Sequence, residues 1–417
     1  MVPYSRRTMA AITGNAVVGQ SGGPTNVINQ SLVGVVQEAR KHKHIAKLLG
    51  SRHGVSGIVK NDFVELSDAP EELLERIALT PSAALGSSRD KPDAEYCTRI
   101  FDSFKKNNVR YFFYIGGNDS ADTARIVQEL AQQHGHELHV VHIPKTIDND
   151  LRVHDHTPGY GSAAKFVAQA LIGVDKDNRS LPGIMIDVIM GRSAGFLTAA
   201  SALGRKYDDD GPHLIYLPET PLDPDKLLAD VDKVYSKLGR CIIAVSEGIV
   251  APDGRSYAEV LAEKSGKAID RDSHGNIQLS GTGALGDMLA HLITAKLPNK
   301  GGKKLRVRAD TFGYLQRSFA GIISPTDASE ARTVGRKAVE YTADPKNLEG
   351  SVVMTRKPGS KYEIDFHLET IKNVARVTKH FPQEWIVNGN DVSKDFIDYA
   401  KPLVGDLPQV GSFAELK

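Results

Sequence analysis

The sequence has few of the residues that mark secreted, membrane-spanning or zinc-stabilised proteins. Only two of its 417 residues are cysteines, Cys97 and Cys241, and they lie far apart without CxxC or Cys/His spacing. This excludes a disulfide scaffold and a structural zinc site, and it fits a reducing compartment. No apolar run is long enough to cross a bilayer, and the N-terminal segment lacks the apolar stretch of a signal peptide. We therefore expect a cytoplasmic protein.

An excess of charge of one sign is also absent. The chain has 52 Lys and Arg against 51 Asp and Glu, which gives a net charge of +1. No global field would recruit nucleic acid or an anionic membrane, so neither is an expected partner. The composition, 41% hydrophobic and 25% charged, is that of a soluble globular protein, and the length favours two domains.

Short apolar, β-rich runs alternate with helical patterns along the chain. Ile28, Leu32, Val35 and Val36 follow helical spacing after the first run. This alternation is typical of βαβ units and of a parallel sheet covered on both faces. We predict an α/β fold with two doubly wound, Rossmann-like domains, each with a mostly parallel sheet and with the active site in the cleft between them. The predicted strands are 16–19, 111–115, 138–143, 184–190, 214–217, 241–245 and 305–307.

Two glycine-rich turns follow predicted strands. The first contains Gly22 and Gly23 and leads into a helix through Pro24. Glycines let the backbone approach a phosphate closely, and the helix N-terminus offers free amides and a positive dipole end. The second turn, around Gly117, repeats the arrangement. Because loops at the carboxyl ends of parallel strands converge on one crevice, we predict a phosphate cradle there.

The segment PKTIDND places a cation, a hydroxyl and two acids after another apolar strand. Lys145 has the reach to meet a pyrophosphate, and Thr146 can donate to a phosphate oxygen. Asp148 and Asp150 are two residues apart, so in an extended segment they point to the same side. Such close carboxylates repel unless one binds a metal or takes a proton. Phosphoryl transfer to a sugar hydroxyl needs a base and Mg²⁺, and the alternative interpretation is an Asx-rich turn.

Three other patterns are set aside. Residues 281–286 fit GxGxxG, but no acid follows about twenty residues later to hold a ribose, which disfavours a dinucleotide site. No GxxxxGK[ST] motif occurs, which excludes Walker-type NTPases. His154 and His156 alternate on a polar loop, and we expect both to face solvent rather than a metal.

These motifs, in this order from Gly22 to Arg317, resemble the phosphofructokinase family, and its pyrophosphate-dependent branch in particular. The resemblance implies that Asp148 deprotonates the 1-hydroxyl of fructose 6-phosphate, and that Asp150 assists it and the metal. An MGR segment, the glutamate of VSEG and a GYxxR-like segment would bind the sugar phosphate, and the arginine of LGSSR would reach the transferring phosphate. These residues are Met190, Gly191, Arg192, Glu247, Tyr314, Arg317 and Arg89.

The resemblance also bears on the phosphoryl donor. ATP-dependent relatives have glycine where Asp119 and Lys145 stand, because nucleotide must lie there. Aspartate at 119 would repel the α-phosphate, while Lys145 would meet the terminal phosphates of a shorter donor, so pyrophosphate is favoured. Asn118 stands where most relatives have a metal-associated aspartate. Its neutral oxygen remains a metal ligand candidate together with Asp150.

A second departure concerns contacts between subunits. Gly183 falls where allosteric ATP-type members carry an arginine donated by the neighbouring subunit, and Arg179 is a candidate to supply that contact.

The resemblance therefore implies reversible, Mg²⁺-dependent transfer from pyrophosphate to fructose 6-phosphate, giving fructose 1,6-bisphosphate and phosphate. Residues 1–160 with about 330–390 would form the donor domain, and residues 161–329 with about 391–417 the fructose 6-phosphate domain. A homodimer or homotetramer is expected. Three alternatives stay open: an ATP-dependent phosphofructokinase, a non-catalytic homologue that only binds sugar phosphate, and a dinucleotide-dependent oxidoreductase.

Overall fold

The computed structural model describes residues 11–257, 259–260, 263, 283–298, 305–375 and 377–413. The chain forms two compact units, each made of several segments. The first unit comprises Met1–Thr146, Leu151–Pro158 and Ala328–Val377. The second comprises Ile147–Asp150, Gly159–Asp327 and Thr378–Lys417.

The first unit is built on a seven-stranded sheet in the order β11-β10-β5-β4-β1-β2-β3. Neighbours from β10 to β2 pair in parallel, and the edge strands β3 and β11 pair antiparallel. Residues 111–115 of β4 are buried on both faces, which explains why a continuous apolar run forms a central parallel strand. The strands are β1 (Gly14–Gln20), β2 (Ile45–Ser51), β3 (Phe63–Glu65), β4 (Val109–Gly116), β5 (His139–Pro144), β10 (Glu349–Arg356) and β11 (Ile364–Glu369).

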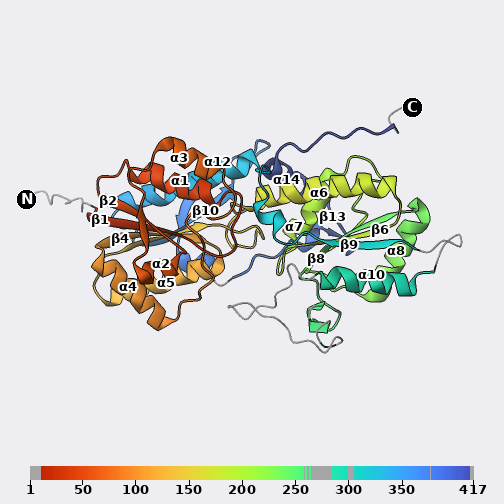
Figure 1. The fold of residues 1–417 in the computed structure, drawn as a ribbon, viewed down its shortest axis with the longest axis horizontal. Helices are drawn as coiled ribbons and strands as arrows, with labels where there is room; N and C mark the ends of the chain where they lie inside the picture. Colours follow the sequence, from red (N-terminus) through yellow and green to blue (C-terminus); the bar gives the residue numbers. More distant parts are fainter. Residues whose placement is uncertain are drawn as a thin grey trace, which may run out of the picture. The chain divides into compact units, whose positions relative to one another are not determined.

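Helices cover both faces of this sheet (Figure 1). Apolar residues of α1, α3 and α12 form the core on one face, and those of α2, α4, α5 and α13 form the core on the other. These helices are α1 (Ile28–Ala39), α2 (Val55–Lys60), α3 (Glu71–Ala78), α4 (Ala94–Lys106), α5 (Asn118–Gln133), α12 (Pro325–Glu340) and α13 (Ile371–Val374).

The second unit contains a four-stranded sheet in the order β7-β8-β6-β9, and all its strands pair in parallel. Helices α8 and α10 contribute to the core on one face of the sheet. The strands are β6 (Ile184–Ile189), β7 (Leu214–Tyr216), β8 (Cys241–Ser246) and β9 (Val307–Thr311), with a separate hairpin of β12 (Ile386–Val387) and β13 (Asp391–Val392). The helices are α6 (Tyr160–Ser180), α7 (Phe196–Ala199), α8 (Pro224–Leu238), α10 (Ala284–Lys296), α11 (Leu315–Ser318) and α14 (Lys394–Val404), with short 3-10 turns η1 (Ala200–Gly204), η2 (Tyr341–Ala343, in the first unit) and η3 (Gln383–Trp385).

The predicted α/β class, with two mostly parallel sheets, is confirmed. Each run expected as a strand overlaps an observed strand, although the run 305–307 shares only Val307 with β9. The strands that the apolar runs did not reveal are β2, β3, β10 and β11 together with the short β12–β13 hairpin. Among the described residues, no helix combines the length and the apolar character that a membrane span requires.

Candidate active site

The turn after β1 lies against two other loops of the first unit. Gly22 has φ +74°, which glycine adopts without strain, and its N–H donates to Ser88 O at 2.9 Å. Ser87 Oγ donates to Gly22 O at 2.6 Å, so the segment that carries Arg89 is fixed to this turn. Ser21 Oγ accepts from Ser120 Oγ at 2.9 Å, which joins the turn to the first helical turn of α5. Hydrogen bonds therefore join the loops of the predicted phosphate cradle to one another.

Lys145 is the cation of this set. It follows β5, its side chain is buried, and its Nζ donates to Gly23 O at 2.7 Å. A Cβ on Gly22 would lie only 3.3 Å from the same Nζ, so the ammonium rests on the glycine turn. The Lys145 N–H donates to Gly116 O at 2.9 Å, which ties the lysine to the second glycine turn as well. A buried cation is thus held against both glycine turns of the predicted phosphate cradle.

Helix α5 begins at Asn118, directly after Gly117, and Asp119 lies exposed in its first turn. The side-chain oxygen of Asn118 is buried and makes no hydrogen bond with any described residue. A buried amide oxygen without a donor is costly, so a ligand that accepts its lone pairs would stabilise it. This oxygen fits a metal ion or a metal-bound water.

His142 lies on β5, three residues before Lys145, and the sequence motifs did not indicate a role for it. It is fully buried, Nε2 donates to Gly116 O at 2.9 Å, and Nδ1 accepts from Ser351 Oγ at 2.8 Å. Burial lowers the pKa of His142 to about 4, so the imidazole is neutral and holds the Gly116 turn as a fixed donor. No motif marks this role, because the contact joins β5 to the glycine turn that follows β4.

The segment that carries Asp148 and Asp150 differs from the extended geometry that we assumed. Asn149, between the two acids, has φ +57° and is fully buried, with Nδ2 donating to the Tyr399 hydroxyl at 2.8 Å. The left-handed residue makes a turn, so the period-two argument for a shared side does not apply. The turn is instead a fixed structure anchored through its middle residue.

In the second unit, the loops after β6 and β8 are packed together. Gly191 has φ +130°, and its carbonyl accepts from Ser246 Oγ at 2.6 Å. Glu247 is buried, and its N–H donates to Ile189 O at 2.8 Å. A Cβ on Gly248 would lie 1.9 Å from Arg192 O, so the backbones of the two loops touch. The predicted Met190–Arg192 segment and Glu247 are therefore neighbours.

The segment after β9 joins the same loops through a residue that the sequence did not indicate. Gln316 is almost fully buried, its Oε1 accepts from the Met190 N–H at 3.1 Å, and its Nε2 donates to Gly313 O at 2.8 Å. Arg317 places its guanidinium carbon 4.4 Å from the centre of the Tyr314 ring, a cation–π contact that orients it. Because β8, β6 and β9 are adjacent strands, their carboxyl-end loops form one continuous group.

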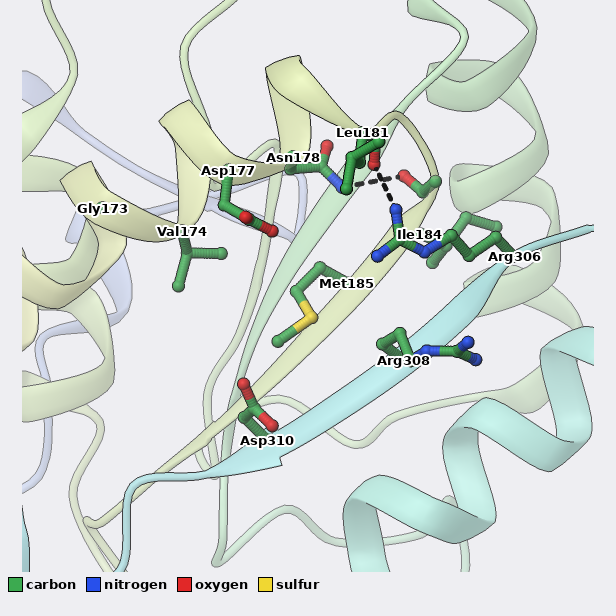
Figure 2. Close-up of a pocket in the computed structure, with 11 residues that line it drawn as sticks. Gly173, Val174, Asp177, Asn178, Leu181, Ile184, Met185, Arg306, Arg308 and Asp310 are labelled. Atoms are coloured by element: carbon green, nitrogen blue, oxygen red, sulfur yellow. Dashed lines mark hydrogen bonds between the residues drawn. The ribbon is translucent and has the colours of Figure 1, made fainter.

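Gly183 lies in a separate pocket of about 250 Å³, lined by α6, the start of β6 and β9 (Figure 2). A Cβ at this position would lie 2.8 Å from Arg306 O, so no larger residue fits without a shift. Arg179 bonds to Asp175, Asp209 and Asp210 at 2.8–2.9 Å and is engaged within its own chain. It is therefore a poor candidate for the missing subunit contact.

The expectation for His154 and His156 was wrong, because both side chains are buried. His156 Nδ1 lies 2.8 Å from Asp155 Oδ2, and its Nε2 lies 2.6 Å from Glu330 Oε2. Burial alone would lower the pKa of His156, but the hydrogen bonds that its ring donates to the two carboxylates outweigh this effect and raise the pKa. Asp155 precedes His156 directly, but Glu330 lies 174 residues away, and the local sequence pattern could not show that partner.

The structure thus groups the predicted site residues in two sets. Gly22, Gly23, Gly117 and Lys145 are joined in the first unit, with Arg89 and Thr146 on the same loops. Met190, Gly191, Arg192, Glu247, Tyr314 and Arg317 are joined in the second unit. Within the described ranges, no three His, Cys, Asp or Glu side chains are placed to hold a metal ion. Gly281 and Thr282 of the GxGxxG pattern lie outside those ranges.

Comparison with known proteins identifies the family. A model of the family described as phosphofructokinase matches residues 15–342. The pyrophosphate–fructose 6-phosphate 1-phosphotransferase of Rhodospirillum rubrum is 53% identical over 393 residues, which covers 94% of each chain. The enzyme of the same name from Halomonas elongata is 35% identical and covers 96% of each chain. The crystal structure of the pyrophosphate-dependent phosphofructokinase from Marinobacter aquaeolei superposes with a TM-score of 0.80 at 30% identity, covering 95% of this chain and 94% of that one. With its motifs, its two mostly parallel sheets and these relatives in agreement, the chain belongs to the phosphofructokinase family.

Proposed function

We propose that this protein transfers a phosphoryl group from pyrophosphate to the 1-hydroxyl of fructose 6-phosphate, giving fructose 1,6-bisphosphate and phosphate. The observation that carries this proposal is the buried ammonium of Lys145, fixed on the Gly22–Gly23 turn by its bond to Gly23 O. Two relatives that match more than nine tenths of the chain bear the name of this activity. The same reaction runs in reverse, because pyrophosphate and the product ester are close in transfer potential.

Pyrophosphate is favoured as donor because two charged side chains stand where a nucleotide would need room. Lys145 holds a positive charge at the glycine turn and would neutralise the terminal phosphates. Asp119, in the first turn of α5, would repel the α-phosphate of ATP. A donor as small and as highly charged as pyrophosphate needs such point charges, since it offers almost no apolar surface.

The acceptor side of the reaction would be served by the second set. Arg192 and Arg317 would pair with the 6-phosphate, and Glu247 would accept hydrogen bonds from the sugar hydroxyls. Asp148 would take the proton from the 1-hydroxyl while the hydroxyl oxygen forms a bond to the terminal phosphorus of pyrophosphate. The bond from that phosphorus to the bridging oxygen breaks, and phosphate leaves. Lys145 and Arg89 would stabilise the charge on the transferring group, and Thr146 would donate to one of its oxygens.

The residues proposed to hold Mg²⁺ are Asn118 and Asp150. The buried side-chain oxygen of Asn118, which has no hydrogen bond among the described residues, fits a neutral ligand of this kind. Mg²⁺ commonly keeps several waters and uses one or two protein oxygens with substrate phosphates, so a sparse protein shell is compatible with it. When bound, the ion would supply positive charge to the phosphates of the donor.

The experiment that tests the proposal measures fructose 1,6-bisphosphate formed from fructose 6-phosphate and Mg²⁺, with pyrophosphate in one reaction and ATP in another. Product with pyrophosphate alone is expected. Product with ATP alone would refute pyrophosphate as the donor but would still support fructose 6-phosphate as the acceptor. No product with either donor would favour a homologue that only binds sugar phosphate. We further propose a homodimer or homotetramer in the cytoplasm, which light scattering and cell fractionation would test.

A further inference from the structure

A short segment of the second unit, T-K-H-F at residues 378–381, bonds to two of the loops described above. We call this segment the strap. It lies far along the chain from both loops and contains none of the residues predicted from sequence motifs. Its side chains and main chain nevertheless make hydrogen bonds to residues 149–150 and to Ser193. They also bond to Glu219, whose carboxylate accepts from the Gly195 N–H as well.

Lys379 makes the contacts to the turn that carries the proposed base. Its main-chain N–H donates to Asp150 O at 2.7 Å, and its Nζ donates to Asn149 Oδ1 at 3.3 Å. Its ammonium also lies 4.9 Å from the centre of the Phe196 ring, which restricts where the side chain can point. One residue therefore holds two consecutive positions of the Asp148–Asp150 turn.

The other end of the strap is fixed to the loop that follows Arg192. His380 Nδ1 lies 3.0 Å from Ser193 O. The Phe381 N–H donates to Glu219 Oε1 at 2.8 Å, and the same oxygen accepts from the Gly195 N–H at 3.0 Å. The strap thus has one partner in the proposed base turn and another in the proposed phosphate-binding loop.

We propose that Lys379 is a positioning residue for phosphoryl transfer, whose ammonium fixes Asn149 and thereby the orientation of Asp148 and Asp150. This inference rests on the proposed function and adds a residue to it. Asn149 has φ +57°, a conformation that needs support from its surroundings. Its amide is held from one side by Tyr399 and from the other by Lys379, so both of its polar atoms are bonded. Loss of the ammonium would leave the amide oxygen without this donor and release the turn.

The role predicts a specific kinetic signature. A base displaced by about 1 Å can cost on the order of 100-fold in rate, while the sugar phosphate is bound by other residues. Lys379→Met keeps the stem and the main-chain N–H but removes the charge. We expect kcat with pyrophosphate to fall about 10- to 100-fold, with the KM for fructose 6-phosphate changed less than threefold. Lys379→Arg restores a cationic donor and should recover much of kcat.

Lys394→Met is the matched control. Lys394 lies on α14 of the same unit, its side chain is 83% exposed, and its partner is Asp398. The same substitution there should leave kcat and KM unchanged. A Lys379→Met protein with kcat within twofold of the wild type would overturn the proposal. A raised KM at unchanged kcat would also overturn it, because Lys379 would then be a substrate ligand.

Chemical restoration of the ammonium separates positioning from a general effect on folding. Cys97 and Cys241 are fully buried, and burial raises the pKa of both thiols, so neither competes for an alkylating reagent. Lys379→Cys, alkylated with 2-bromoethylamine, regains a lysine-like ammonium, whereas iodoacetamide adds a neutral group of similar length. We expect at least a fivefold higher kcat for the aminoethylated protein.

Equal kcat for the two alkylated proteins would overturn the role of the charge. Failure of the proposed function is a separate result, because it would appear as absence of turnover in the wild-type protein before any variant is compared.

Discussion

Asp187 is a carboxyl group buried in the middle of a sheet, and it predicts an unusual dependence of stability on pH. It lies on β6, opposite Ala244 of β8 and Asp310 of β9, and its side chain is fully buried. Neither carboxyl oxygen has a hydrogen-bond partner among the described residues. Burial, with a smaller effect of Asp310, raises the pKa of Asp187 well above its usual value. The folded protein therefore favours the protonated, neutral form of this group more strongly than the unfolded chain does.

The sign of the effect follows from proton linkage. The unfolded chain loses the Asp187 proton above about pH 4, whereas the folded chain keeps it to higher pH. Stability is therefore highest below the unfolded pKa and falls as pH rises towards the folded pKa. Each pH unit in that window costs ~1.4 kcal/mol. For a unit of roughly 200 residues, this corresponds to about 3–6 °C in the midpoint of thermal unfolding.

Asp187→Asn removes the ionisable group and keeps its shape. We expect the two proteins to unfold at similar temperatures near pH 4, and the variant to become progressively more stable than the wild type as pH rises. Thermal unfolding of both proteins, followed by circular dichroism from pH 4 to 8, measures this difference. Asp208→Asn is the control, because Asp208 is exposed in a turn of the same unit and should show no comparable slope. A difference between wild type and Asp187→Asn that does not change with pH would refute the reasoning.

Three further predictions concern the site and its support. Asp148→Ala should lower kcat about 10²- to 10⁴-fold, because it removes the proposed base, while fructose 6-phosphate still binds by calorimetry; unchanged turnover would exclude Asp148 from that role. Replacing Asp119 and Lys145 with glycine together should admit ATP as donor in the product assay, and a double variant that still rejects ATP would place donor choice elsewhere. His156→Gln should destabilise the protein by about 3 kcal/mol, because it leaves the Glu330 carboxylate without its buried cation. Since the pKa of His156 is raised, the loss of unfolding free energy should be full below about pH 6.5 and should shrink as pH rises through the pKa of His156 in the folded protein. A loss that stays constant from pH 5 to 9 would contradict this prediction.

Much of the fold followed from local patterns in the sequence. Residues 111–115 read as a strand because they are continuously apolar, and the structure buries them on both faces of a parallel sheet. Several of the proposed site residues directly follow such strands, as Lys145 follows β5 and Glu247 follows β8. Because parallel strands bring their carboxyl ends to one edge of a sheet, the order of strand and motif was enough to predict which loops would carry the proposed site.

Local patterns failed where the outcome depends on a distant partner. His156 was expected in solvent, but Glu330, 174 residues away, bonds to it in the interior. Asp148 and Asp150 were expected on an extended segment, but Asn149 between them turns the chain and is held by Lys379, 230 residues away. Gln316 gave no signal of its own, although it joins two loops of the second set.

By itself, the sequence determined the class of fold and the family, because these depend on periodicity and on the order of motifs along the chain, and it indicated the residues that would carry the proposed chemistry. The tertiary structure alone decided how those residues are held: the ammonium of Lys145 on Gly23 O, the neutral imidazole of His142 under the Gly116 turn, and Lys379 against Asn149. Each of these contacts joins segments far apart in sequence. Their geometry exists only once the strands are paired and the interior has excluded water, which no local pattern specifies.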